Sequence, residues 1–207
     1  GTRNSFIIGI SATFLATALG TVAALGLSRR NMPFKGTIMA ILISPMIVPL
    51  IITSAGMFFF YSKIGLTHTY LGLILAHTAL GTPFVVITVT ATLTGFDTNL
   101  IRASQSLGAD TMRTFFKVIM PLILPGVISG ALFAFITSFD EVVVVMFVGS
   151  VEQITIPKQM WAGLRQETSP VILCMATCLV FLSIALLTTV ELLRRRSERL
   201  RGIKLRN

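Results

Sequence analysis

Residues 95–126 read GFDTNLIRASQSLGADTMRTFFKVIMPLILPG and connect two long apolar segments of the chain. The stretch is too long and too apolar for a plain polar connector, and it predicts two short helices separated at Gly108. Glycine suits such a break because it adopts a positive φ without the steric cost of a Cβ atom. Asp110 or Thr111 can cap the second helix by accepting hydrogen bonds from its free amide groups. The pattern therefore predicts a structured loop rather than an irregular linker.

Each predicted helix of this loop has an apolar side. Leu100, Ala103 and Leu107 fall on one side of the first helix. The apolar side of the second is formed by Met112, Phe115, Phe116 and Ile119. Apolar side chains are stabilised by removal from water, so both sides need a surface to bury against. The ends of the neighbouring apolar segments could provide it, and so could the groove of a soluble partner. The residues themselves leave both possibilities open.

The rest of the chain is apolar from end to end. Of its 207 residues 54% are hydrophobic and 12% are charged, whereas soluble domains carry about 25% charged residues. A helix needs about 20 apolar residues to cross the hydrocarbon of a bilayer. Pro45, Pro49 and Pro83 fall in such apolar segments, where we expect kinks. Five segments qualify and predict an all-α polytopic membrane protein: residues 5–27, 36–60, 71–94, 122–148 and 171–193.

The basic residues predict the orientation. Short cytoplasmic loops carry an excess of Lys and Arg, and 13 of the 17 Lys and Arg residues fall on one side of the predicted topology. That side contains the loop 95–121 and a basic tail, 194–207, whereas 149–169 is predicted to be a periplasmic loop. This bias also explains the formal net charge of +9, because the chain has too little polar sequence to build a nucleic-acid groove. No cleavable signal pattern precedes residues 5–27, so we expect an earlier span and six in the full protein, with a five-span protein as the alternative.

A pattern of small residues, a glycine and prolines runs through the loop at Ala103, Ser106, Leu107, Gly108, Ala109, Phe115, Pro121, Leu122 and Pro125. It resembles the cytoplasmic signature of the permease subunits of binding-protein-dependent ABC importers. That signature has a Glu-Ala-Ala triplet, a Gly three to four residues later and a downstream Leu-Pro. Arg102 stands where the signature has Glu, and Ser104 stands in place of an Ala. The likeness follows the order of the spans and implies a single type I ABC importer-like transmembrane domain over residues 1–207.

In that family the loop forms coupling helices that dock into an ATPase subunit. The resemblance assigns this role to Arg102, Ala103, Ser106, Leu107, Gly108, Ala109, Asp110, Phe115 and Pro121. It implies as partners a second permease subunit, two ATPase subunits and a periplasmic substrate-binding protein. The chain has no glycine-rich loop ending in Gly-Lys-Ser/Thr, which would cradle phosphates. ATP and Mg would therefore bind to the partner ATPase, and we expect no cofactor, metal ion or catalytic residue on this chain.

The sequence ITSFDEVVVVMF places Asp140 and Glu141 inside the apolar segment 122–148. Counted along one helix from Leu122, Asp140 lies about 27 Å further on, near the outer edge of the membrane. A charged side chain in the hydrocarbon costs several kcal/mol, so it usually faces a cavity or a partner. Two readings stay open: the acids pair with a base or cap a broken helix, or they draw a cationic solute along a path. His68 and His77 are expected to pack or hydrogen-bond rather than to bind metal.

The run Ser138-Phe139-Asp140-Glu141 and the later IPKQMWAGLRQETSP resemble the spermidine/putrescine branch of the family. The resemblance implies a substrate path at Ser138, Phe139, Asp140, Glu141 and Trp161, and a polyamine as the solute. Carboxylates suit an ammonium group because charge-assisted hydrogen bonds replace its lost hydration. The alternative is an ion-coupled secondary transporter that uses Asp140 and Glu141, although such proteins often contain internal repeats and none is visible. A membrane enzyme is disfavoured, since adjacent carboxylates on one helix diverge too far for shared acid-base work.

Overall fold

The computed structural model describes residues 1–29, 31–97, 99–166 and 170–200, and every regular element in these ranges is helical. The all-α prediction is therefore confirmed. Parts of the predicted periplasmic loop (167–169) and of the predicted basic tail (201–207) lie outside the described residues. The helices are α1 (Thr2–Leu27), α2 (Lys35–Ile47), α3 (Leu50–Ile64), α4 (Tyr70–Thr94), α5 (Asn99–Ser106), α6 (Thr111–Thr114), α7 (Met120–Phe139), α8 (Val143–Val148), α9 (Ile156–Gln166) and α10 (Pro170–Leu200), and a π-helical turn (Phe115–Ile119) joins α6 to α7.

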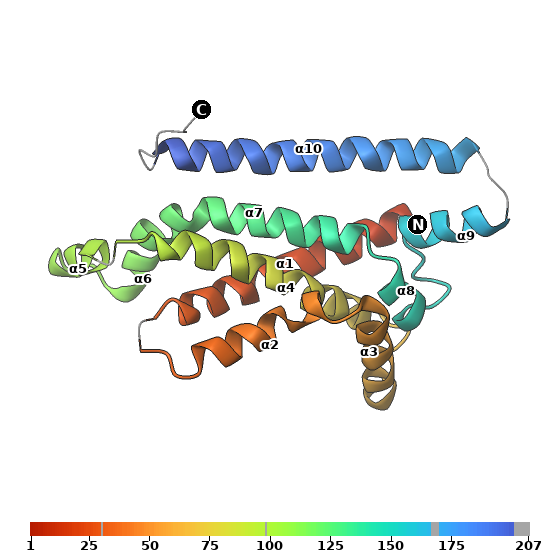
Figure 1. Cartoon of the computed structure of the whole chain (residues 1–207), viewed down its shortest axis with the longest axis horizontal. Helices are drawn as coiled ribbons and strands as arrows, with labels where there is room; N and C mark the ends of the chain where they lie inside the picture. Colours follow the sequence, from red (N-terminus) through yellow and green to blue (C-terminus); the bar gives the residue numbers. More distant parts are fainter. Residues whose placement is uncertain (30, 98, 167–169, 201–207) are drawn as a thin grey trace.

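Helices α1, α4 and α7 pack together as the centre of the molecule (Figure 1). Their contact surfaces include small residues, which let the backbones approach closely. A Cβ atom added to Gly20 of α1 would lie 2.7 Å from Cβ of Val85 on α4. A small-residue stripe on α7 recurs every fourth position and is buried throughout: Gly126, Gly130, Ala134 and Ser138. At these positions the backbones of the three helices therefore pack closely.

The predicted span 36–60 is sharply bent. It is divided into α2 and α3, which are bent by 104° at their junction. Val48 is extended, with φ −71° and ψ 136°. Pro49 follows it and directly precedes α3. A residue before proline is pushed out of the α region by contact with the proline ring, so the chain changes direction here. The expected kink thus occurs at Pro49, whereas Pro45 and Pro83 lie inside α2 and α4.

The predicted span 122–148 is wrong at its carboxyl end. The helix begins earlier, because Thr111–Phe139 forms one run of 29 residues through the π-helical turn and Pro121. It ends at Phe139, and α8 follows as a separate helix after a short break. Among the described residues, three helices are long and apolar enough to cross a membrane: α1, α4 and this run. Helices α2 and α3 together can count as a fourth crossing. At the fifth predicted span, α10 contains a shorter apolar stretch, Leu173–Thr189.

Two groups of short helices lie at opposite ends of the long axis of the molecule. Helices α5 and α6 lie at one end, whereas α8, α9 and the start of α1 lie at the other (Figure 1). Helix α10 runs alongside α7 between these ends and contacts it. The predicted coupling loop and the predicted acidic path are therefore at opposite ends of the bundle.

Candidate functional site

The turn between α5 and α6 is built on Gly108. Its φ is +80°, in the left-handed region, and its amide donates to the carbonyl oxygen of Gln105 at 2.9 Å. The amide of Ala109 donates to Ser104 O at 3.1 Å, which closes the turn. The predicted break at Gly108 is confirmed. No atom lies within 4 Å of a Cβ placed on Gly108, so the position requires glycine for its backbone angle and not for lack of space.

Two further hydrogen bonds stabilise this region, one at the start of α6 and one between α5 and α6. Oδ1 of Asp110 accepts from the amide of Arg113 at 2.7 Å, so the predicted cap of the second helix is confirmed at Asp110. Oγ of Ser104 on α5 lies 3.0 Å from Oγ1 of the buried Thr114 on α6. Ser104 occupies the position where the family signature has an Ala, and its hydroxyl links the two helices here. The loop is thus held by side-chain contacts as well as by its turn.

Helices α5 and α6 and the π-helical turn that follows them expose four large apolar side chains. We call these side chains the apolar end surface: Leu100, Leu107, Met112 and Phe116. Leu107, at the tip of the turn, is 88% exposed. The chain's own helix ends therefore leave these side chains uncovered. The other residues assigned to coupling are distributed around this surface: Arg102, Ala103, Ser106 and Asp110 are exposed, Ala109 and Phe115 are half-buried, and Pro121 is exposed on the continuous helix beyond them.

At the opposite end of α7 the two acids have different surroundings. Asp140 follows the last residue of α7, is exposed, and its amide donates to Ile136 O at 3.0 Å. Glu141 is only 7% exposed, and its Oε1 accepts from the amide of Val144 at 2.9 Å, at the start of α8. The two acids are thus not on one continuous helix. Among the side chains that the structure describes, neither acid forms an ion pair.

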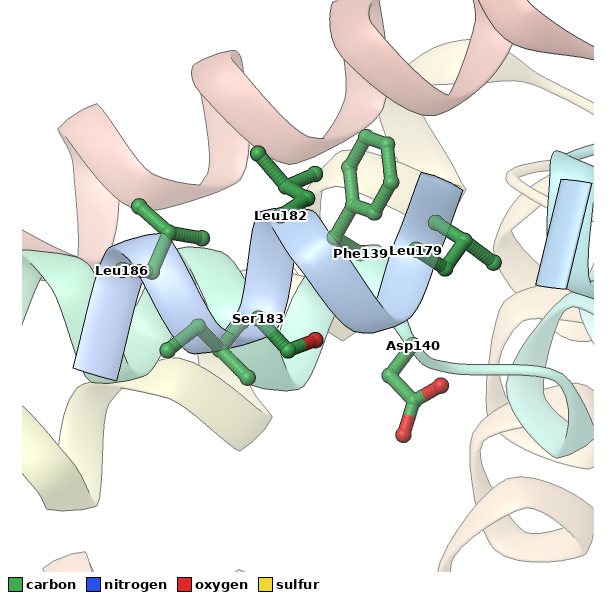
Figure 2. Close-up of a pocket in the computed structure, with 7 residues that line it drawn as sticks. Phe139, Asp140, Leu179, Leu182, Ser183 and Leu186 are labelled. Atoms are coloured by element: carbon green, nitrogen blue, oxygen red, sulfur yellow. The ribbon is translucent and has the colours of Figure 1, made fainter. Parts of the chain in front are cut away.

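Asp140 borders a cleft between α7 and α10 (Figure 2). The cleft is lined by Ile136, Phe139, Asp140, Leu179, Leu182, Ser183 and Leu186. In Figure 2 the carboxylate of Asp140 points away from the ring of Phe139, and the hydroxyl of Ser183 lies on the carboxylate's side of α10. The walls are therefore mainly aliphatic, with one carboxylate and one hydroxyl at the edge. The cleft is small, with a volume of about 50 Å³.

The remaining predicted path residues lie apart from this cleft. Ser138 is buried, and its Oγ lies 2.8 Å from Nδ1 of His77 on α4. Trp161 is on α9, is 47% exposed and is not among the described residues that line the cleft. His68 contacts the end of α8 in two ways. Its amide donates to Val148 O at 2.8 Å, and its ring Nδ1 lies 3.3 Å from Gly149 O. Both histidines hydrogen-bond, as expected, and the described residues contain no group of three potential metal ligands.

A polar network that the sequence did not reveal fixes the segment after α8. Nδ2 of Asn4 donates to Glu152 O at 2.7 Å and to Ile154 O at 3.0 Å. Oγ of Ser5 accepts from the amide of Ile156 at 2.8 Å. Nε2 of Gln153 donates to the carbonyl oxygen of His68 at 2.9 Å. Residues that are about 150 positions apart thus hold the start of α1 against the start of α9, and no local spacing in the sequence signals them.

Comparison with known protein families identifies the family that this chain matches. Residues 16–200 match the family described as "Binding-protein-dependent transport system inner membrane component". The spermidine/putrescine transport system permease protein PotC of Haemophilus influenzae is 31% identical over 195 residues, which cover 94% of this chain and 76% of that protein. PotC of Escherichia coli is 31% identical over 185 residues, covering 89% of this chain and 70% of that protein. The putrescine transport system permease protein PotI of Escherichia coli is 29% identical over 186 residues, covering 85% and 65%.

Solved structures with the same fold are also ABC transporter chains. A chain of the inward-facing MetNI methionine ABC transporter superimposes with a TM-score of 0.67, at 22% identity, over 99% of this chain and 94% of that chain. An amino acid ABC transporter crystallised with histidines gives a TM-score of 0.67 at 16% identity, over 95% and 92%. At these identities the likeness concerns the fold alone.

Proposed function

The chain belongs to the family of binding-protein-dependent transport system inner membrane components, and from this premise we propose that it forms half of an ATP-driven import path for a polyamine such as spermidine or putrescine. It is a permease subunit of an ABC importer and a multi-pass protein of the inner membrane, and its fold is that of a type I importer. The predicted family and fold class are thus confirmed. The observation on which the solute proposal depends is the 31% identity to permeases named for spermidine and putrescine.

A cationic solute also agrees with the chemistry at the end of α7. Asp140 is exposed beside an aliphatic cleft and has no ion-pair partner among the described side chains. A polyamine combines ammonium groups with methylene segments, and its ammonium groups form strong charge-assisted hydrogen bonds with carboxylates. The proposed path comprises Ser138, Phe139, Asp140, Glu141 and Trp161. An ion-coupled secondary transporter, the alternative use of the two acids, is not favoured by the family.

The apolar end surface is proposed to bind the partner ATPase. Leu107 and Met112 are exposed on the linked helices α5 and α6, at one end of the bundle. Exposed apolar patches on such an element are typical of protein interaction sites. The proposed coupling residues remain Arg102, Ala103, Ser106, Leu107, Gly108, Ala109, Asp110, Phe115 and Pro121. ATP and Mg would be bound by the ATPase, so this subunit would catalyse no reaction of its own.

The remaining partners follow from the same proposal. A second permease subunit would complete the path, and a periplasmic binding protein would deliver the solute near the segment after α8. The coupling end of the molecule and the carboxyl-terminal tail would then face the cytoplasm, in agreement with the excess of Lys and Arg there.

The proposal is tested by reconstituting the whole importer in vesicles with its binding protein. We expect uptake of radiolabelled spermidine or putrescine that requires both ATP and the binding protein, and stimulation of ATP hydrolysis by the loaded binding protein. Uptake driven by a sodium or proton gradient without the ATPase would overturn the importer mechanism. ATP-dependent uptake of neutral or anionic solutes only would retain the importer and overturn the polyamine assignment.

A further inference from the structure

Helix α8 is held at its two ends by side chains of opposite charge. At its start, Oε1 of Glu141 accepts from the amide of Val144 at 2.9 Å. At its end, Nζ of Lys158 on α9 donates to Val145 O at 3.2 Å and to Ser150 O at 3.4 Å. A negative charge at the amino end of a helix and a positive charge at its carboxyl end both interact favourably with the helix dipole. Partial burial lowers the pKa of the Lys158 amine, and the two carbonyl oxygens replace part of the hydration that burial removes.

Helix α8 is also anchored by its apolar residues. Val144, Val145 and Val148 are fully buried, in a cluster that includes Tyr61, Leu73, Ala76 and Leu80 of α3 and α4. Only residues 140–142 separate this anchored helix from the end of α7. The backbone of Asp140 is therefore held on one side by α7 and on the other by α8.

We infer that the two adjacent acids have different tasks: Asp140 meets the cationic group of the solute, whereas Glu141 and Lys158 are positioning residues that hold α8 and thereby direct Asp140. The inference rests on the proposed function. Glu141 is buried, and its carboxylate already accepts a hydrogen bond from the chain, so an arriving cation does not reach it directly. Asp140 is exposed and lines the cleft between α7 and α10. Lys158 is itself a cation and would repel a cationic solute. We therefore assign to it the task of holding α8, not of contacting the solute.

Matched substitutions in the complete importer separate the two tasks, with the KM and the maximal rate of spermidine uptake as readouts. Asp140→Asn should raise KM about tenfold or more, the size expected for losing one charge-assisted contact. Glu141→Gln keeps an oxygen that accepts from Val144, so it should raise KM less than about threefold, whereas Glu141→Ala, which removes the acceptor, should raise it by more. An equal rise of KM in Asp140→Asn and Glu141→Gln would overturn the inference, because the charge of Glu141 would then act on the solute.

The role of Lys158 has its own pair of variants. Lys158→Met should raise KM several-fold at equal amounts of assembled complex, and Lys158→Arg, which keeps a donor, should restore it to within about twofold. A merely structural role would lower the amount of complex and leave KM unchanged, and that result would overturn the assignment of Lys158.

A second measurement does not depend on polyamine uptake. In a Cys174→Ser, Cys178→Ser background, Asp140→Cys should react with a water-soluble cationic thiol reagent, and adding Lys158→Met should change this rate at least about twofold while Lys158→Arg leaves it the same. Equal rates in all three would overturn the positioning role. If the wild-type importer takes up no polyamine, the proposed function fails while this labelling still decides the arrangement.

Discussion

Nδ1 of His77 on α4 lies 2.8 Å from Oγ of Ser138 on α7, and both side chains are buried. This hydrogen bond joins two of the three central helices, and Ser138 lies two residues before Asp140. Nε2 of His77 has no partner among the described residues. Among the described residues, the Ser138 hydroxyl is therefore the hydrogen-bond partner of the His77 ring. Ser138 is also the last member of the small-residue stripe of α7, and it adds a polar contact to that stripe.

Replacing Ser138 by Ala should destabilise the protein. The change leaves both ring nitrogens of the buried His77 without a partner, which costs about 1–3 kcal/mol. The measurement is thermal unfolding of the purified protein in detergent, where we expect a clear fall in the midpoint. Thr177→Ala is the control, because Thr177 is exposed and its hydroxyl bonds only to Leu173 O of its own helix. Equal midpoints in the two variants would show that the His77 contact contributes no stability.

Replacing Gly130 by Ala should separate α4 from α7. A Cβ atom there would lie 2.8 Å from Cα of Val85, and a backbone atom cannot move aside as a flexible side chain can. Overpacking of this kind costs about 1–3 kcal/mol. Gly56→Ala on α3 is the matched control, because no atom lies within 4 Å of its Cβ position. Unfolding in detergent compares the two, and a Gly130→Ala protein as stable as Gly56→Ala would contradict the close packing of α4 and α7.

The sequence predicted features that depend on local chemistry. Long apolar segments predicted where the helices lie, Gly108 predicted the break in the loop, and Asp110 predicted the cap of α6. The spacing of Gly126, Gly130 and Ala134 was also visible and would have predicted the contact face of α7. Each of these signals arises within one helix or one turn, so no knowledge of the tertiary fold is needed to read it.

Other features depend on contacts between distant parts of the chain. Pro49 predicted a kink, but the angle of 104° is not contained in a proline. No proline or glycine marks the end of α7 at Phe139, and the burial of Glu141 follows from packing around α8. The bonds from Asn4 to residues 152 and 154 likewise have no local signal. The two acids were therefore found from the sequence, but their separate surroundings were not.

Replacing Leu107 by Asp should weaken binding of the partner ATPase. Leu107 is 88% exposed, so the change should leave the stability of the chain within about 0.5 kcal/mol. Introducing a charge at the centre of an apolar interface should lower copurification of the ATPase at least about tenfold. Val151→Asp is the control, because Val151 is 84% exposed and lies beyond α8, at the opposite end. ATPase loss in both variants, or in neither, would count against the apolar end surface as the docking site.

Substitutions at Gly108 should separate the backbone requirement of the turn from its surface. The φ of +80° costs a residue with a Cβ atom about 1–2 kcal/mol, and asparagine tolerates this region far better than a β-branched residue. Gly108→Val should therefore abolish ATPase stimulation and transport while membrane insertion stays intact, and Gly108→Asn should retain most of both. The readouts are ATP hydrolysis with loaded binding protein and the amount of chain in the membrane.

Nothing lies within 4 Å of the added Cβ at position 108. A different effect of the two variants would therefore come from the backbone angle and not from a clash with other residues of this chain. Loss of function in both would mean that the ATPase contacts this position directly, and normal function in both would remove Gly108 from the coupling pathway.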